Sequence, residues 1–245
     1  DLYAVAIKSE GTAMAAGAYG NTFTRRNNPN WLQINPLEPN AVSSIDWPTA
    51  QKGFATLSSG HMLVTQNGGV SWARVPLREG IYADRVIFAN SQQGTVFISW
   101  DTLLYTANGG DTWEKRPMPQ GAYGVVGAHF PTDQIGYAVG YSGMVLKTID
   151  GGNSWSINFM APGVNLNDVF FTNADTGFAT SYWAGTFRTT NGGNTWTLIP
   201  GLEGVALSID FPTPMTGYSI GAPNYAFKTT DGGFTWNPIA FPFTN

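Results

Sequence analysis

Short runs of apolar and β-branched residues alternate along this chain with clusters of glycine, asparagine, threonine and proline. Residues 164–201 show the pattern, because VNLNDVFF, FATSYW, TFRTT and WTLIP are separated there by TNADTG, AG and NGGNT. Apolar runs of this length between such clusters are typical of β-strands. The 3.6-residue apolar period that would indicate a helix is not sustained anywhere. The pattern predicts an all-β protein with four short strands in this segment.

The four-strand segment recurs along the chain. Its clearest marker is an octapeptide, Thr-x-Asn/Asp-Gly-Gly-x-Ser/Thr-Trp, which ends at Trp72, Trp113, Trp155, Trp196 and Trp236. These tryptophans are 41, 42, 41 and 40 residues apart, and the same period leads back to Trp31 in the degenerate copy TRRNNPNW. A second marker is an aromatic residue that ends an apolar run, at Trp47, Phe88, Phe130, Phe171 and Phe211.

A unit of about 40–45 residues with four strands has the length of one β-propeller blade. The repeats cover approximately residues 1–37, 38–78, 79–119, 120–161, 162–202 and 203–245. We therefore expect a single all-β domain over residues 1–245, a six-bladed β-propeller with four antiparallel strands per blade. The strands of a blade are called A to D here, in chain order. The octapeptide then forms the turn between strands C and D.

Each position of the octapeptide suits a structural role. The Asp or Asn side chain can accept hydrogen bonds from backbone N–H groups two residues further on, and the glycines allow a positive φ. The hydroxyl adds a local hydrogen bond, and the tryptophan fills space between blades. A catalytic or calcium-binding turn is the alternative, but three of the five intact copies carry neutral Asn, which suits neither role. We interpret as structural Asn67, Asn108, Asp150, Asn191, Asp231, Trp72, Trp113, Trp155, Trp196 and Trp236.

The octapeptide resembles the Asp-box, S/T-x-D/N-x-G-x-x-W, of BNR-repeat propellers. These include sialidases, xyloglucan-cleaving glycosidases, sortilin-type receptors and photosystem II assembly factors. The long form of the motif, preceded by a Gly-Phe/Tyr-Ala strand, is most similar to the photosystem II assembly factor group. Members of that group bind partner proteins in the thylakoid lumen, in part through an arginine-rich patch. The resemblance implies a protein-binding propeller in which Arg78, Arg85 and Arg116 form a sparse version of the patch.

Topology places the candidate ligand residues at the end of the blades away from the boxes. The A–B turns share the end that carries the boxes, whereas the B–C turns and D–A connections lie together at the opposite end. The B–C turns supply an aromatic residue or histidine in each repeat: Tyr19, His61, Trp100, Tyr141, Tyr182 with Trp183, and Tyr225. The D–A connections add Tyr82 and Tyr123. Such a ring suits sugar stacking or a protein hot spot, and the alternative is that these residues pack between blades.

The sequence contains only part of the residues that a sialidase or another glycosidase needs. A sialidase needs three arginines that clamp a carboxylate, and the seven arginines here are dispersed. Asp46 and Asp210 occupy matching positions on strand A and could in principle hydrolyse a glycoside, but an Asp bonded to a neighbouring blade is the alternative reading. His61 and His129 lack an evident third ligand for a zinc ion.

Composition and charge limit the classes of partner that we expect. The net charge of −4, with scattered basic residues, lacks the footprint of a nucleic-acid binder, and no apolar run reaches the length of a membrane span. The chain has no cysteine, which leaves the compartment open. It starts at Asp1 without a methionine, from which we expect an exported, processed mature chain, either secreted, periplasmic or in an organelle lumen.

We predict a non-catalytic binding module or assembly scaffold without cofactor or metal. A protein partner is the leading prediction, and a glycan partner, bound by the aromatic ring of a lectin, is the alternative. A glycoside hydrolase is the third reading, and neither nucleic acid nor a membrane span is expected.

Overall fold

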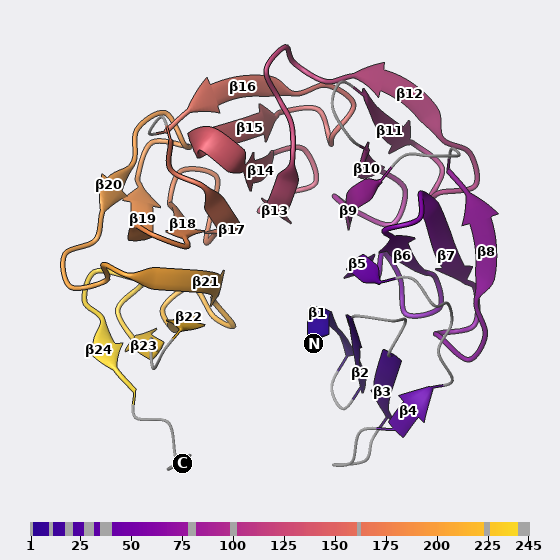
Figure 1. Ribbon diagram of the computed structural model, residues 1–245, viewed down its shortest axis with the longest axis horizontal. Coiled ribbons are helices and arrows are strands. Elements are labelled where there is room, and N and C mark those ends of the chain that lie inside the picture. The colour runs from indigo at the N-terminus through magenta and orange to yellow at the C-terminus, as the bar shows by residue number, and fades with distance from the viewer. Residues whose placement is uncertain are drawn as a thin grey trace. The chain divides into compact units, whose positions relative to one another are not determined.

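The structure is a computed structural model that describes residues 2–9, 12–17, 22–26, 32–34, 41–77, 82–98, 102–160, 163–222 and 226–239. The chain divides into two compact units, Asp1–Met118 and Pro119–Asn245. Each unit holds three sheets, and in every sheet four consecutive strands pair in chain order (Figure 1). All of the pairs are antiparallel, which confirms the all-β prediction and the four-stranded repeat.

The first unit contains strands β1 to β12. Its first sheet comprises β1 (Leu2–Ser9), β2 (Thr12–Gly17), β3 (Thr22–Arg26) and β4 (Leu32–Ile34). The second comprises β5 (Val42–Asp46), β6 (Gly53–Leu57), β7 (His61–Thr65) and β8 (Ala73–Pro76). The third comprises β9 (Ala83–Phe88), β10 (Gly94–Ile98), β11 (Thr102–Thr106) and β12 (Glu114–Pro117).

The second unit repeats the arrangement. Its first sheet comprises β13 (Val125–His129), β14 (Gly136–Gly140), β15 (Met144–Thr148) and β16 (Ser156–Phe159), with a 3-10 turn η2 (Tyr141–Gly143) between β14 and β15. The second comprises β17 (Leu166–Phe171), β18 (Gly177–Ser181), β19 (Gly185–Thr189) and β20 (Thr197–Leu198). The third comprises β21 (Val205–Asp210), β22 (Gly217–Ala222), β23 (Ala226–Thr229) and β24 (Asn237–Pro238).

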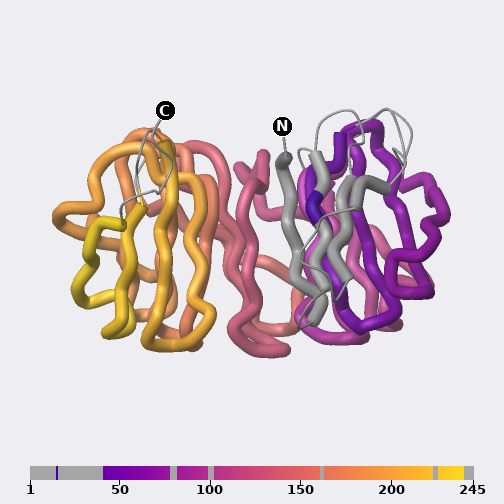
Figure 2. The backbone as a smooth tube through the Cα atoms, turned by 90° about the horizontal axis from the view of Figure 1, so that it is seen from below, coloured from indigo at the N-terminus to yellow at the C-terminus, as the bar shows by residue number. Residues whose placement is uncertain are grey.

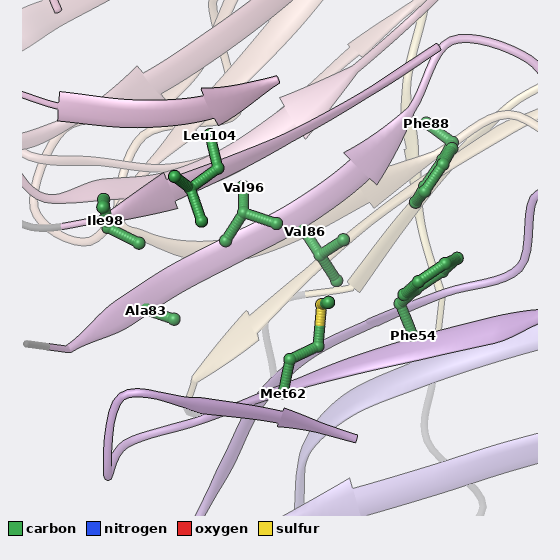
Figure 3. Packing of buried hydrophobic residues seen from close by; sticks show 8 residues of the cluster. All are labelled: Phe54, Met62, Ala83, Val86, Phe88, Val96, Ile98 and Leu104. Atoms are coloured by element: carbon green, nitrogen blue, oxygen red, sulfur yellow. The ribbon is translucent and has the colours of Figure 1, made fainter. Parts of the chain in front are cut away.

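Burial differs between the strands of a sheet. Strands B, namely β6, β10, β14 and β18, are buried at every position, whereas the D strand β8 is exposed along its whole length. A strand that is covered on both faces needs a continuous apolar run, which these B strands have. The core therefore lies between neighbouring sheets. Figure 3 shows one such layer, in which Phe54 and Met62 pack against Val86, Phe88 and their neighbours on the next sheet.

Aromatic rings connect consecutive sheets within each unit. In the second unit Trp196 packs edge-on against Phe171 of its own sheet, with ring centroids 5.9 Å apart. Phe171 stacks in turn on Tyr137 of the preceding sheet. Offset and edge-on pairs contribute about 0.5–1.5 kcal/mol beyond the area that they bury. The two aromatic markers of the repeat thus lie in one continuous stack.

Glycines make room for these rings. A Cβ on Gly177 would lie 2.6 Å from the ring of Phe171, so the first residue of this B strand has no space for a side chain. The second glycine of the octapeptide at Gly110 has a φ of 84°, and a Cβ there would overlap the ring of Phe54. The Gly-Gly pair is therefore needed both for the backbone conformation and for the close approach of the ring.

Each A strand contains a β-bulge at the same place. The register shifts at one equivalent residue of every A–B pair, namely Tyr3, Ser43, Asp84, Val126, Asn167 and Leu207, and β1 has a second shift at Lys8. A bulge leaves one residue out of the ladder and changes the direction of its side chain. These six positions were not distinguished by the strand pattern of the sequence.

Candidate functional site

The octapeptide closes its turn through the threonine and the Asn or Asp. In the first intact copy the Thr65 hydroxyl donates to Asn67 Oδ1 and accepts from the N–H of Gly69, at 2.9 Å each. Asn67 Oδ1 also accepts from the N–H of Ser71, four residues further on. The predicted acceptor role of this side chain is present, but its distance along the chain was wrong, because the threonine hydroxyl occupies the nearer N–H groups.

Asn and Asp hold this turn with hydrogen bonds of opposite direction. Asn108 Nδ2 donates to the hydroxyl of Thr112 at 2.8 Å. In the copy with Asp231, the hydroxyl of Thr235 instead donates to the carboxylate. A hydroxyl can donate or accept, so either residue closes the turn. The hydrogen bond from Thr235, with further ones from Thr229 and the backbone, lowers the pKa of Asp231 below its usual range.

Every intact octapeptide is bonded to the A–B turn of its own sheet. The N–H of its first glycine donates to a carbonyl of that turn in the pairs Gly68–Gln51, Gly109–Gln92, Gly151–Gln134, Gly192–Asp175 and Gly232–Met215. The A–B and C–D turns therefore share one end of each sheet, here called the box end, as the topology predicted. The opposite end, with the B–C turns and D–A connections, is called the B–C end.

The acidic and imidazole groups at the end of strand A join neighbouring sheets. Asp46 accepts from its neighbour Trp47 and, at 2.6 Å, from the N–H of Phe88 on the next sheet. His129 holds the equivalent place in the second unit, where its Nδ1 accepts from the N–H of Phe171 at 3.2 Å. Burial raises the pKa of Asp46 to about 6, although the hydrogen bonds and the nearby Arg85 oppose that shift. Both oxygens of Asp46 are thus occupied by backbone N–H groups.

Three further strand-A carboxyl groups differ in their surroundings. Asp168 accepts from the hydroxyl of Ser208 at 2.8 Å and from the N–H of Ile209, both on the next sheet. Burial raises the pKa of Asp84, the bulged residue of β9, to about 6. Asp210, which matches Asp46 in the repeat, is exposed and belongs to the other unit.

His61 does not lie in a turn. The sequence placed it in a B–C turn, whereas the structure makes it the first residue of β7. Its Nδ1 lies 3.0 Å from the carbonyl of Ser59 and 3.2 Å from a guanidinium nitrogen of Arg74. Within the ranges that the structure describes, no three His, Asp or Glu side chains are grouped so as to hold a metal ion.

Two members of the predicted arginine patch lie at opposite edges of one sheet. Arg85 lies on the A strand β9, and Arg116 lies on the D strand β12, at the opposite edge of the same sheet. Arg116 pairs with Glu114 at 2.8 Å and lies over the ring of Tyr105. Arg78 falls outside the described residues, so the patch stays a prediction.

The second unit exposes aromatic side chains at its B–C end. Tyr141 is 47% exposed, Tyr182 41% and Trp183 77%. The Tyr141 ring covers Gly124, where no Cβ would fit, and the rings of Tyr182 and Trp183 lie edge-on at 4.6 Å. Figure 2 shows the strands of this unit side by side, so that their turns collect at two ends. The other predicted members, Tyr19, Trp100 and Tyr225, lie outside the described residues.

Two apolar residues are exposed on the face of the third sheet that is turned away from the second sheet. Leu207, the bulged residue of β21, is 41% exposed, and Ile220 of β22 is 48% exposed. Ile220 pairs with Ser208, the residue after Leu207, so that both lie near the B–C turn of their sheet. Only a faint signal in the sequence marks Leu207, because the apolar alternation is interrupted in VALSID.

These sheets and turns define an Asp-box repeat protein whose fold is consistent with a β-propeller. Residues 81–197 match the family described as Photosynthesis system II assembly factor YCF48, which supports the resemblance found in the motifs. No curated protein sequence matches the chain.

Solved structures share the fold. The structure described as YCF48 bound to D1 peptide has a TM-score of 0.76 at 16% identity, over 96% of this chain and 79% of that one. YCF48 from Cyanidioschyzon merolae has a TM-score of 0.58 at 16% identity, over 93% and 95%. An ancestral GH74 enzyme has a TM-score of 0.77 at 17% identity, over 97% of this chain but 38% of its own. At these identities the likeness shows the fold alone. Over the described residues, no helix has the length and hydropathy needed to cross a membrane.

Proposed function

We propose that this protein is a non-catalytic binding module or assembly scaffold that engages a protein partner through the B–C end of its sheets. The observation that carries the proposal is the exposure of Tyr141, Tyr182 and Trp183 on consecutive sheets of one unit. Tyr and Trp are enriched among the few residues that carry most of the binding energy of a protein interface. The fold likeness to YCF48, which was solved with a peptide of D1, supports a protein partner.

The carboxyl groups support a role without catalysis. A glycosidase needs one carboxyl group as acid and a second as base or nucleophile, both free to reach the substrate. Asp46 accepts backbone N–H groups at both oxygens, and Asp168 is bonded to the next sheet in the same way. The chain also spans less than half of the GH74 enzyme that it resembles.

The architecture proposed for the whole chain is one six-bladed β-propeller over residues 1–245. The common strand order of the sheets and the likeness to YCF48 over 96% of the chain support it. Export of the chain stays a prediction.

Site-specific photo-crosslinking in the source cells tests the function. A benzophenone side chain in place of Tyr182, which is 41% exposed at the B–C end, should give a discrete covalent adduct with another polypeptide. The same group at Ile149, which is 72% exposed at the box end, should not give that adduct. Equal adducts at both sites would contradict the assignment of the surface. Turnover of xyloglucan or another glycan by the purified protein, lost on Asp46→Asn, would contradict the non-catalytic role.

A further inference from the structure

We infer that the B–C end of the second unit binds a protein segment that carries lysine or arginine side chains. The surface consists of the exposed side chains of Tyr141, Tyr182 and Trp183, together with the exposed Glu203 of the following D–A connection, and is called the aromatic surface below. The inference rests on the proposed function and specifies the chemistry of the partner. Four observations carry it.

The turns of the first two sheets are joined to each other. The N–H of Ser142, in the turn that follows Tyr141, donates to Asn165 Oδ1 at 3.0 Å. Asn165 immediately precedes β17, whose first residue Leu166 pairs with Ser181. Ser181 is followed directly by Tyr182 and Trp183. Tyr141 and the Tyr182–Trp183 pair therefore belong to one connected surface.

The connection continues into the third sheet. The backbone of Leu202 and Glu203 lies against Gly185, and a Cβ there would come within 2.8 Å of Glu203 Cα. Gly185 follows Trp183 by two residues, so the Glu203 backbone lies beside this turn. Asn167 Nδ2 donates to the carbonyl of Ala206 at 2.8 Å. Ala206 is the second residue of β21, so the turns of all three sheets are joined at this end.

Four polar groups around these rings are occupied within the protein. Ser142 Oγ is hydrogen-bonded to the hydroxyl of Tyr123 at 3.0 Å, and Ser181 Oγ accepts from the N–H groups of Trp183 and Ala184. The Asn165 oxygen and the Asn167 amide nitrogen are bonded as described above. A sugar site needs polar groups that fix the hydroxyls of the ligand. Exposed rings whose neighbouring serine and asparagine groups are already bonded within the protein favour a protein segment over a glycan.

The charge at the B–C end indicates the sign of the partner. Most of the unit's seven acidic residues lie in or beside the box-end turns, but the exposed Glu203 lies in a D–A connection at the B–C end, where none of the unit's three basic residues lies. The basic side chains are engaged elsewhere: Lys147 donates to the carbonyl of Gly192, the Arg188 guanidinium lies 4.1 Å from the ring centroid of Phe234, and Lys228 lies over Tyr218. A lysine or arginine on the partner would gain a cation–π contact with exposed Trp183 or Tyr182, and a favourable charge interaction with Glu203.

Selection from a phage-displayed random-peptide library on the whole protein tests this inference. Peptides enriched on the wild type should contain more lysine and arginine than the starting library. As synthetic peptides they should bind the Trp183→Ala variant about tenfold or more weakly than the wild type. Glu203→Gln, which keeps an acceptor for the N–H of Gly201, should weaken binding by about threefold. Ile149→Ala, at the box end of the same unit, should bind as the wild type does.

The possible results separate this inference from the function on which it rests. Enriched peptides that are neutral or acidic, or that bind Trp183→Ala as tightly as the wild type, would overturn the inference and leave a protein-binding module. The absence of enriched peptides would overturn the inference as well. If the wild type then bound a glycan array and Trp183→Ala did not, the proposed function would also fall, in favour of a lectin. Because Trp183 is mostly exposed, the variant should keep the wild-type melting temperature, which serves as the control for folding.

Discussion

The two units share one sheet design and differ in their surface. The first unit has nine acidic and nine basic residues, among them six of the seven arginines, whereas the second has seven acidic and three basic residues. Among the described residues, the first unit exposes the aromatic side chain of Tyr82, and the second exposes those of Tyr141, Phe159, Tyr182, Trp183 and Phe234. The octapeptides and strand-A aromatics recur in both. The comparison teaches that the C–D turn holds the repeat together, while the B–C turns are free to differ.

The carboxyl groups of the two units also differ in their response to pH. Burial raises the pKa of Asp46 and of Asp84, in the first unit, to about 6. In the second unit partial burial of Asp150 is outweighed by hydrogen bonds from Ser154 and Thr148, which lower its pKa, and the pKa of Asp231 is lowered as well. Acidification should therefore favour the folded state of the first unit and disfavour that of the second.

The largest loss of stability is expected at the second glycine of the octapeptide, which occurs in both units. Gly110→Ala and Gly233→Ala each place a methyl group at positive φ against a phenylalanine ring, of Phe54 or Phe178. Each should lower the free energy of unfolding by about 2–4 kcal/mol. Gly201 has a φ of 83°, and a Cβ added there would meet nothing within 4 Å, so Gly201→Ala should cost about 1 kcal/mol. Urea denaturation measures all three, and equal costs would show that the rings leave room for a side chain.

The second effect concerns Asp46. Its pKa rises from 3.8 to about 6 on folding, so the folded chain holds the proton more tightly than the unfolded chain. The contribution to stability is complete below about pH 4 and is lost by about 2–3 kcal/mol as the pH rises through 6. Asp46→Asn should make the free energy of unfolding less dependent on pH between these values, as urea titrations at several pH values would measure. A slope identical to that of the wild type would show that the carboxyl group is hydrated in the folded state.

The third prediction concerns two threonines that occupy the same position of the repeat and should differ in their contribution to stability. Thr56 and Thr180 are the fourth residues of β6 and β18, and neither is exposed. The Thr56 hydroxyl is bonded to Ser43 at 2.9 Å, whereas Thr180 Oγ1 has no hydrogen-bond partner. Thr56→Val should destabilise the protein by about 1 kcal/mol, and Thr180→Val should leave its stability unchanged or raise it. Thermal unfolding of the two variants provides the measurement, and a reversed order would refute the assignment of the partners.

The smallest effect is expected for Asp231→Asn. Asn67, Asn108 and Asn191 already close the same turn, so the variant should be as stable as the wild type at pH 7. The lowered pKa of Asp231 gives stability that is present above its unfolded pKa and is lost as the pH falls below about 4. The variant should lose less stability than the wild type on acidification, as melting temperatures at pH 7 and below 4 would show. Equal losses in both proteins would contradict this role of the carboxylate.

The sequence predicted the repeated core positions better than the positions of the bulged and surface residues. Trp196 and Phe171 recur at a fixed period because each has to reach a ring at the same place in every sheet. The bulged residues Asp84 and Leu207 were not predicted, because a bulge depends on how the neighbouring strand pairs and leaves little trace in the apolar pattern. His61 was placed in a turn for a similar reason, since polar residues occur both in turns and at the first position of a strand.

Hydrogen exchange with and without a selected lysine- or arginine-containing peptide tests the central claim most directly. If the aromatic surface is the binding site, the peptide should slow exchange at residues 139–145, 180–186 and 202–207. Exchange in the octapeptides and in the described strands of the first unit should not change. Protection in the first unit, or at the box end of the second, would contradict the account.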